Sequence, residues 1–319
     1  MPYDCIIVGA GPAGLSAALM LGRCRRRVLV CDGGDPRNGR ATGIHNYLTR
    51  DGMPPLEFLR LAREEVRVYP TIEFRNTEVT DARRGDHGFT LACADGTQLR
   101  TRKLLLATGV VDELPEIEGL QPLYGTSVHH CPYCDAWEWR DEPLAVHGRA
   151  EEGSAVALGL TVWSADVVLC TDGPSGLTKK ARDQLTRFGI AVREEKIARL
   201  EGQRGWLSRI IFEEGEPLPR RALFVCSGQH QRSGLAQKLG CRFTSNGAVN
   251  TGSCEATDVP GLYVAGDASK DAQFVIVAAA EGAEAAMAIN KSMHQEDLAQ
   301  NRISSPRRTS LGGPYAKSG

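Results

Sequence analysis

Three glycines, Gly9, Gly11 and Gly14, lie between a continuous apolar run at residues 3–8 and an Ala-rich stretch at 15–21. An apolar run of this length is expected of a parallel strand that is buried on both faces. In a strand–turn–helix unit the first glycine permits the tight turn, the second lets a pyrophosphate approach the backbone, and the third allows close helix packing. This spacing predicts a dinucleotide-binding unit at the start of the chain.

A carboxylate at the end of the next strand fits the same unit. The apolar run 28–31 ends at Asp32, where a carboxylate about twenty residues after the glycines accepts hydrogen bonds from a ribose. The pyrophosphate would meet the unpaired N–H groups at the N-terminus of the helix. The alternative, a glycine-rich turn that binds nothing, stays open at this point.

The pattern of strand, turn, helix and strand occurs a second time. Residues 144–146 are apolar, 148–153 form a second turn sequence, and a helix-like stretch leads to a strand at 167–170. Domains usually contain about 100–200 residues, so two domains fit the 319 residues. The sequence predicts an α/β fold with two Rossmann-type domains.

Charge and hydropathy exclude several classes of partner. The formal net charge is -1, whereas a nucleic acid or an anionic membrane would select a basic face. No apolar run approaches the roughly 20 residues of a membrane span, and the chain opens with Asp4 rather than with a secretory leader. We therefore expect a cytoplasmic protein with no nucleic-acid or membrane partner.

The pair Cys131 and Cys134 is the chemical centre of the sequence. Two thiols at this spacing close a tight, exchangeable disulfide, and the motif lowers the pKa of one thiol. Asp135 follows directly, and a carboxyl there can pass a proton to or from a leaving thiolate. His129 and His130 precede the pair, so a zinc site is an alternative, although no second ligand cluster is visible and we expect no metal. A further alternative is that Cys131 and Cys134 are ordinary core cysteines.

Two further features bear on function. Gly266 and Asp267 follow a short apolar strand. The pair either marks a plain strand end or places the Asp267 carboxylate on the ribityl chain of a flavin. Tyr133, Trp137 and Trp139 place aromatic side chains near the cysteines. These rings either stack on a flat substrate or on a second flavin, or they only pack inside the protein.

The order of these motifs resembles the low-molecular-weight thioredoxin reductases, over roughly residues 3–293. The resemblance implies a homodimeric FAD flavoprotein in which the second domain is inserted in the first. Residues 1–115 and 246–298 would form the FAD-binding domain, and 116–245 would form the NAD(P)H-like domain that carries the cysteines. The remaining residues, 299–319, have little apolar content and are predicted to be a disordered tail.

The resemblance also implies residue roles. Cys134 would exchange electrons with the flavin, Cys131 would attack the partner disulfide, and Asp135 would be the acid–base residue. The residues that would hold FAD are Gly9, Gly11, Gly14 and Asp32 on the ADP half, and Asn46, Gly266, Asp267 and Gln273 on the ribityl chain and flavin ring.

The second nucleotide turn departs from the family. Ala150 stands at the middle glycine position, and Glu151 and Glu152 place negative charge at a helix N-terminus meant for a phosphate. Asp172 would repel a 2′-phosphate. These residues disfavour NADPH, and the Cys-Pro-Tyr-Cys sequence resembles relatives that work without pyridine nucleotides.

Three functions follow as hypotheses. The first is an FAD-dependent thiol–disulfide oxidoreductase whose partner is a thioredoxin-like protein or a small dithiol or disulfide, with ferredoxin or a second flavin as electron donor. The second is an oxygen-dependent dithiol oxidase that forms a disulfide in a small molecule. The third is a non-enzymatic flavin or zinc redox sensor.

Hinges between the domains are expected near Pro115 and Gly247.

Overall fold

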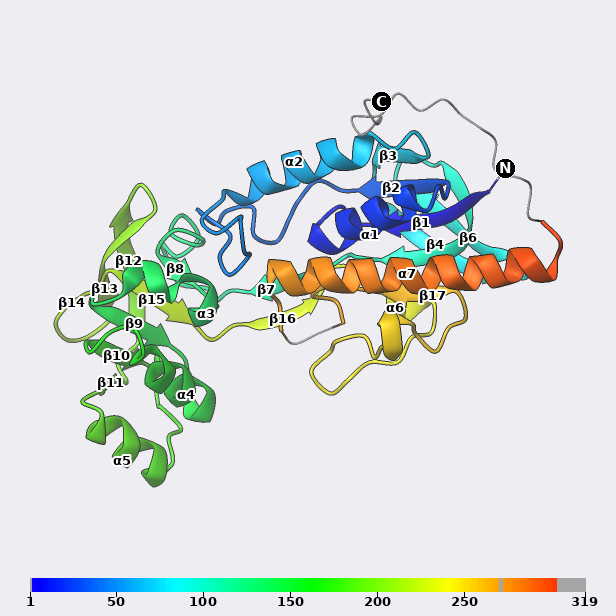
Figure 1. The fold of residues 1–319 in the computed structure, drawn as a ribbon. Helices are drawn as coiled ribbons and strands as arrows, with labels where there is room; N and C mark the ends of the chain where they lie inside the picture. The colour runs from blue at the N-terminus through cyan, green and yellow to red at the C-terminus, as the bar shows by residue number, and fades with distance from the viewer. Residues whose placement is uncertain (1, 270–271, 303–319) are drawn as a thin grey trace. The chain divides into compact units, whose positions relative to one another are not determined.

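The computed structural model describes residues 2–269 and 272–302 (Figure 1). The chain divides into two compact units. The first contains the described residues up to Pro36, Leu56–Val110 and the described residues from Gln231 onward. The second contains Arg37–Pro55 and Val111–His230.

The first unit is built on a sheet with the strand order β3-β2-β1-β6-β5-β4, in which β17 also pairs with β6. Its parallel strands are β1 (Tyr3–Val8), β2 (Val28–Asp32), β3 (Ile72–Asn76), β6 (Gln98–Leu106) and β17 (Leu262–Val264). The antiparallel strands are β4 (Val79–Gly85) and β5 (Gly88–Cys93). The central strand β1 is buried along nearly its whole length, as its continuous apolar run predicts.

Two helices of the first unit pack closely against each other. These are α1 (Pro12–Arg23) and α7 (Val275–Ala299), which lie side by side in Figure 1. A Cβ atom on Gly282 would lie 2.0 Å from the carbonyl oxygen of Ala13, so the glycine in α7 permits this approach. The other helical segments of the unit are α2 (Pro55–Arg67), α6 (Leu235–Lys238) and the short η2 (Ser253–Glu255).

The second unit repeats the design with a sheet in the order β11-β10-β9-β15-β8. Every pair in it is parallel, and its strands are β8 (Val128–His129), β9 (Leu144–His147), β10 (Val167–Cys170), β11 (Ala191–Arg193) and β15 (Ala222–Val225). Its helices are α3 (Pro132–Asp135), η1 (Ala136–Trp139), α4 (Ala150–Leu160) and α5 (Lys179–Arg187). An antiparallel meander follows, formed by β12 (Ile197–Gln203), β13 (Trp206–Phe212) and β14 (Leu218–Pro219). The predicted α/β fold with two Rossmann-type units is confirmed.

The grouping by contacts differs from the predicted domain boundaries in two segments. Residues 37–55 belong with the second unit, where Arg37 pairs with Asp112. Residues 231–245 belong with the first unit, because Leu235 and Cys241 pack in the same apolar cluster as Val79. The boundaries themselves remain a prediction.

The chain passes between the units in two strands that pair with each other, β7 (Val110–Glu113) and β16 (Gly228–Gln231). The predicted hinge near Pro115 lies close to the first of these strands. Gly247 belongs to the first unit by contacts, and Val249, two residues further on, is fully buried in its core; both hinge positions stay predictions.

The C-terminal helix is longer than expected. The apolar pattern predicts a helix over 275–290, and α7 continues to Ala299. The rest of the predicted tail lies largely outside the described residues. Among the residues that the structure describes, no helix combines the length and apolar character that a membrane span requires.

Candidate active site

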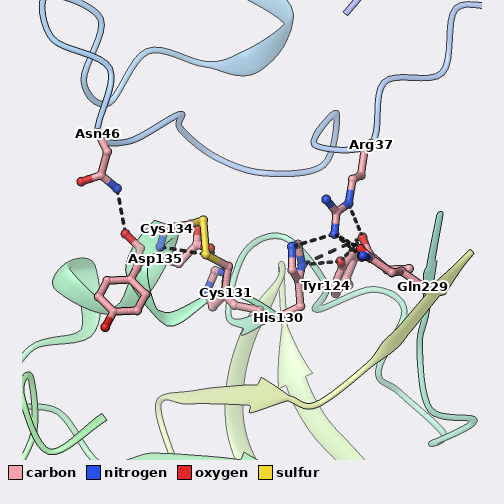
Figure 2. Close-up of a disulfide and its surroundings, with 11 residues drawn as sticks. Arg37, Asn46, Tyr124, His130, Cys131, Cys134, Asp135 and Gln229 are labelled. Carbon is pink, nitrogen blue, oxygen red and sulfur yellow. Dashed lines mark hydrogen bonds and ion pairs between the residues drawn. A yellow bond between two sulfur atoms is a disulfide. The ribbon is translucent and has the colours of Figure 1, made fainter. Parts of the chain in front are cut away.

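The two cysteines of the motif form a disulfide at the carboxyl end of β8 (Figure 2). Their Cα atoms lie 5.3 Å apart. Cys131 caps the N-terminus of α3, and its Sγ accepts a hydrogen bond of 3.2 Å from the backbone N–H of Cys134. Pro132 occupies the first helical position, where its fixed φ favours the turn. Both cysteines are half-buried, so the disulfide is held by backbone and remains accessible to a reactant.

Asp135 lies one residue beyond the disulfide and is oriented by the same short helix. Its backbone N–H donates to the carbonyl oxygen of Cys131 at 3.2 Å. Its carboxylate Oδ1 lies 3.4 Å from Nδ1 of His129. The predicted acid–base residue therefore lies next to both cysteines and has an imidazole beside it.

The two histidines before the motif have separate sets of partners. His129 is buried beside Trp139 and Phe224, whereas His130 contacts Tyr124 and Arg37. The described residues contain no group of three His, Cys, Asp or Glu side chains able to hold a metal ion. In this structure the two thiols are joined in a disulfide and each imidazole has other partners, and the expectation of no metal stays a prediction.

His130 belongs to a polar network that the sequence did not reveal (Figure 2). Arg37 donates to Nε2 of His130 at 3.4 Å, and a guanidinium only donates, so the neutral ring carries its proton on Nδ1. That N–H faces the hydroxyl oxygen of Tyr124 at 2.8 Å, and the hydroxyl donates to Asp112 at 3.0 Å. Nε of Arg37 donates to the same carboxylate at 3.0 Å. Arg37 lies far from the others in the sequence, Asp112 lies in strand β7, and the four residues share no motif, so only the fold could unite them.

The charges in this network are set by burial and by pairing. Burial is the largest single influence on Asp112 and opposes its ionisation. The hydrogen bonds from Arg37 and Tyr124, together with the charges of Arg37 and His130, outweigh burial and hold the pKa of Asp112 below its ordinary value. Burial lowers the pKa of His130, although the Asp112 carboxylate acts in the opposite direction. The network therefore presents a neutral imidazole directly before the redox pair.

Asn46 lies on a segment that contacts the disulfide loop. Its Nδ2 donates to the backbone carbonyl of Tyr133, between the two cysteines, at 2.8 Å. The preceding His45 lies 3.6 Å from the Glu138 carboxylate. These contacts tie Asn46 to the second unit, and its predicted contact with a flavin stays a prediction.

The first glycine turn has the geometry of a diphosphate cradle. A Cβ on Gly14 would lie 1.9 Å from the carbonyl oxygen of Gly9, and a Cβ on Gly9 would lie 2.2 Å from that of Ala107. A Cβ on Gly11, by contrast, would meet no protein atom within 4 Å. Gly11 also caps α1 with no side-chain hydrogen bond, so the helix N–H groups are not taken by a side chain at the cap. These features fit the diphosphate of FAD.

The other predicted cofactor residues belong to the same unit. Asp32 lies at the end of β2, where one carboxylate oxygen accepts from the Ala10 N–H at 3.3 Å and the other pairs with Arg63. A Cβ on Gly266 would lie 3.1 Å from that of Ala13, so the turn after β17 meets the first turn of α1. Asp267 and Gln273 lie between this turn and α7.

In the second glycine turn the end glycines still permit close packing, but contacts within the chain already use the polar groups of the turn. A Cβ on Gly153 would lie 2.5 Å from the carbonyl carbon of Gly148, so both end glycines are required for close packing. Ala150 has a φ of 49°, and its N–H donates to the carbonyl oxygen of Ser175 at 2.8 Å. A backbone donor at the start of α4 is thus already used.

Side chains around this turn are also engaged internally. Nε of Arg149 donates to the carbonyl oxygen of Thr171 at 2.7 Å, and its Nη2 donates to that of Asp172. The Asp172 carboxylate accepts from the backbone N–H of Ile197 at 2.8 Å. Glu151 and Glu152 stand in the first turn of α4, where their charges oppose an anion.

Together these features define a disulfide oxidoreductase with two Rossmann-type units, one of them fitted for a dinucleotide and the other carrying the redox pair. The model of the family described as pyridine nucleotide-disulphide oxidoreductase matches residues 3–282. The chain belongs to this family.

Individual relatives agree with this assignment. A protein from Arthroderma benhamiae, named a probable thioredoxin reductase, is 30% identical over 334 residues, covering 92% of this chain and 81% of the relative. The crystal structure of a putative thioredoxin reductase from Bacillus anthracis has a TM-score of 0.88 and 33% identity, covering 92% of this chain and 99% of that one. The crystal structure of HlmI has a TM-score of 0.90 and 36% identity, covering 94% of this chain and 95% of that one.

The family confirms three predictions made from the sequence. The chain is similar to thioredoxin reductases, it has their fold, and it is an FAD-dependent disulfide oxidoreductase. A purely non-enzymatic sensor is therefore the weakest of the three functional hypotheses.

Proposed function

We propose that this enzyme exchanges electrons between FAD and the thiols of a partner through Cys131 and Cys134, and that it does so without NADPH. The observation that carries the proposal is the closed second turn, in which Ser175 takes the backbone N–H of Ala150 and Arg149 folds onto Thr171. A nicotinamide dinucleotide would have to displace both contacts and then approach two glutamates.

The exchange chemistry follows from the two sulfur atoms. A thiolate of the partner dithiol attacks Sγ of Cys131, the disulfide breaks, and Cys134 leaves as a thiolate. The second partner thiol then attacks the mixed disulfide, which releases the partner as a disulfide and Cys131 as a thiolate. Asp135 accepts a proton from an attacking thiol and returns it to a leaving thiolate. FAD, when bound, supplies the two-electron acceptor or donor for the cysteine pair.

The residues of the first unit would hold the cofactor. Gly9, Gly11 and Gly14 would receive the diphosphate, and Asp32 would accept from a ribose hydroxyl. Asp267, Gln273 and Asn46 are proposed for the ribityl chain and ring.

A second candidate is an oxygen-dependent dithiol oxidase, which runs the same exchange toward disulfide formation in a small molecule. The closed nucleotide turn favours it, because electrons must then enter from thiols or from a donor such as ferredoxin or a second flavin. Tyr133, which lies between the two cysteines in the sequence, and Trp137, three residues after Cys134, are exposed, whereas Trp139 is buried. Tyr133 packs edge-on against Trp163, and the Arg140 guanidinium lies over one face of the Trp137 ring, so a substrate would meet the remaining exposed surface of these rings.

The test uses the flavin-loaded enzyme and its Cys134→Ser variant. Dithiothreitol should reduce the flavin of the wild type, and the variant should lose this reaction by at least about 1,000-fold. A variant that retains full thiol–disulfide turnover would refute the proposal. Oxygen uptake and hydrogen peroxide formation with a small dithiol would favour the oxidase, and their absence with every dithiol tried would exclude it.

A further inference from the structure

His129 has a polar partner at each ring nitrogen although only 4% of its surface is exposed. The indole Nε1 of Trp139 lies 3.0 Å from Nε2 of His129, and Nδ1 lies 3.4 Å from Oδ1 of Asp135. The imidazole therefore stands between a buried tryptophan and the proposed acid–base residue.

The tryptophan determines which nitrogen carries the proton. An indole N–H only donates, so Nε2 of His129 is the acceptor. The neutral ring then carries its proton on Nδ1, the nitrogen that faces Asp135. A protonated Nδ1 beside a carboxylate stabilises the ionised form of that carboxylate.

Aromatic side chains pack around the imidazole of His129 and hold it in place. The ring centroid of His129 lies 5.6 Å from that of Phe224, and Trp139 stacks edge-on with Trp206 at 5.5 Å. His129 ends β8, and the Cys131 cap of α3 follows two residues later. The sheet thus holds the Nδ1–H at a fixed place relative to the disulfide.

We propose that His129 is a positioning residue whose Nδ1–H orients the Asp135 carboxylate for proton exchange with the cysteine thiols. The proposal rests on the proposed function and names the group that prepares its acid–base residue. Asp135 takes the proton of an attacking thiol and returns it to a leaving thiolate, while His129 retains its own proton throughout.

Other titratable groups near Asp135 must be considered in a pH experiment. Burial raises the pKa of Tyr124 and lowers that of His130, and in both cases the charge of Asp135 is a smaller influence that acts upward. Glu138 on the adjoining turn is paired with His45. His130→Asn is therefore the matched control, since it alters the neighbouring imidazole and leaves His129 in place.

The experiment measures the rate at which dithiothreitol bleaches the flavin of the anaerobic holoenzyme, from about pH 5 to 9. His129→Ala should slow the reaction by about 10-fold near neutrality and move the acidic limb of the rate–pH profile to higher pH. His129→Asn, whose amide N–H lies near the position of Nδ1, should restore most of the rate. Trp139→Phe should give a smaller shift in the same direction, and His130→Asn should leave the acidic limb in place.

Two results would overturn the proposal. One is an acidic limb in His129→Ala that coincides with that of the wild type, and the other is an Asn variant as impaired as the Ala variant. If the Ala variant fails to fold, the acidic limbs of the rate–pH profiles of His129→Asn and Trp139→Phe are compared with that of the wild type instead. Full activity of Cys134→Ser would instead refute the proposed function, so the two failures are distinguishable.

Discussion

The two glycine turns of this enzyme use the same packing and have different chemistry. In each, a Cβ on the last glycine would strike the backbone of the first, at 1.9 Å for Gly14 and 2.5 Å for Gly153. At the middle position, Gly11 borders open space, whereas Ala150 uses its N–H on the carbonyl oxygen of Ser175. The end glycines therefore serve the fold, and the middle position decides whether a ligand can approach.

Charge also distinguishes the two turns, and like the packing it favours a ligand at the first turn only. The first turn of α1 contains no acidic residue, whereas that of α4 contains Glu151 and Glu152. A helix N-terminus favours anions, so the first turn suits a diphosphate and the second opposes one. A duplicated fold can thus keep its architecture while only one copy keeps a nucleotide site.

The largest expected effect comes from substituting the end glycines. Gly14→Ala should destabilise the first unit by about 1–3 kcal/mol or more, because the new Cβ strikes backbone, and flavin should be lost. Gly153→Ala should destabilise the second unit similarly and leave the flavin content unchanged. Thermal unfolding and the flavin-to-protein ratio measure both. Loss of flavin in both variants would contradict the division of roles.

Substitution of the middle glycine should separate binding from folding. Gly11 has a φ of -75°, which alanine adopts without strain, so Gly11→Ala should leave the stability of the flavin-free protein unchanged. Its methyl group would crowd the diphosphate and weaken FAD binding by about 10- to 100-fold. Flavin titration of the apoprotein gives the affinity, and undiminished binding would show that the diphosphate lies elsewhere.

Reversing the departures of the second turn should produce a smaller effect. The triple variant Ala150→Gly, Glu151→Gln and Glu152→Gln removes the Cβ and two charges. Since each charge at a helix N-terminus contributes about 0.3–1 kcal/mol, NADPH-driven flavin reduction should rise by about 10-fold. Arg149→Gln alone is the comparison variant. No gain from the triple variant would mean that the Cβ of Ala150 and the two charges are not what excludes NADPH, which would leave the backbone contact with Ser175 and the contact of Arg149 with Thr171.

The smallest effect concerns the residue that precedes each turn, Val8 in one unit and His147 in the other. Burial lowers the pKa of His147, although Asp172 opposes it, and its Nδ1 is buried without a hydrogen-bond partner. The unfolded chain therefore binds the proton more readily, so stability falls as pH drops below about 6.5.

His147→Val should remove this acid-dependent loss. It should also stabilise the second unit by about 1 kcal/mol at neutral pH, because an unsatisfied buried nitrogen disappears. Melting temperatures at acidic and alkaline pH test the prediction, with His130→Asn, at a half-buried imidazole, for comparison. An unchanged slope of stability against pH would contradict it.

The sequence predicted what depends on local spacing. Gly9 to Gly14, the Cys131–Cys134 pair and Asp135 each carry their meaning within a few residues, and the structure places them at strand ends as expected. The contact of Arg149 with Thr171 and the network of Arg37 with Asp112 and His130 could not be predicted. They join residues distant in sequence whose types also suit ordinary surface loops.

The grouping of residues 37–55 with the second unit shows the same limit. This segment is rich in Gly, Pro, Asn and Arg, so it has no apolar periodicity that would assign it to a core. Its position depends on side-chain contacts such as Asn46 with the carbonyl of Tyr133, which only the folded chain reveals.

The most direct test of the central claim is an anaerobic titration of the flavin-loaded enzyme, followed by the visible absorption of the flavin. NADPH is added to one sample, dithiothreitol to a second, and dithiothreitol to Cys134→Ser in a third. The closed second turn predicts full bleaching by the dithiol in the wild type and none by stoichiometric NADPH. Rapid bleaching by NADPH would contradict the account and show that the second turn still admits a nicotinamide dinucleotide.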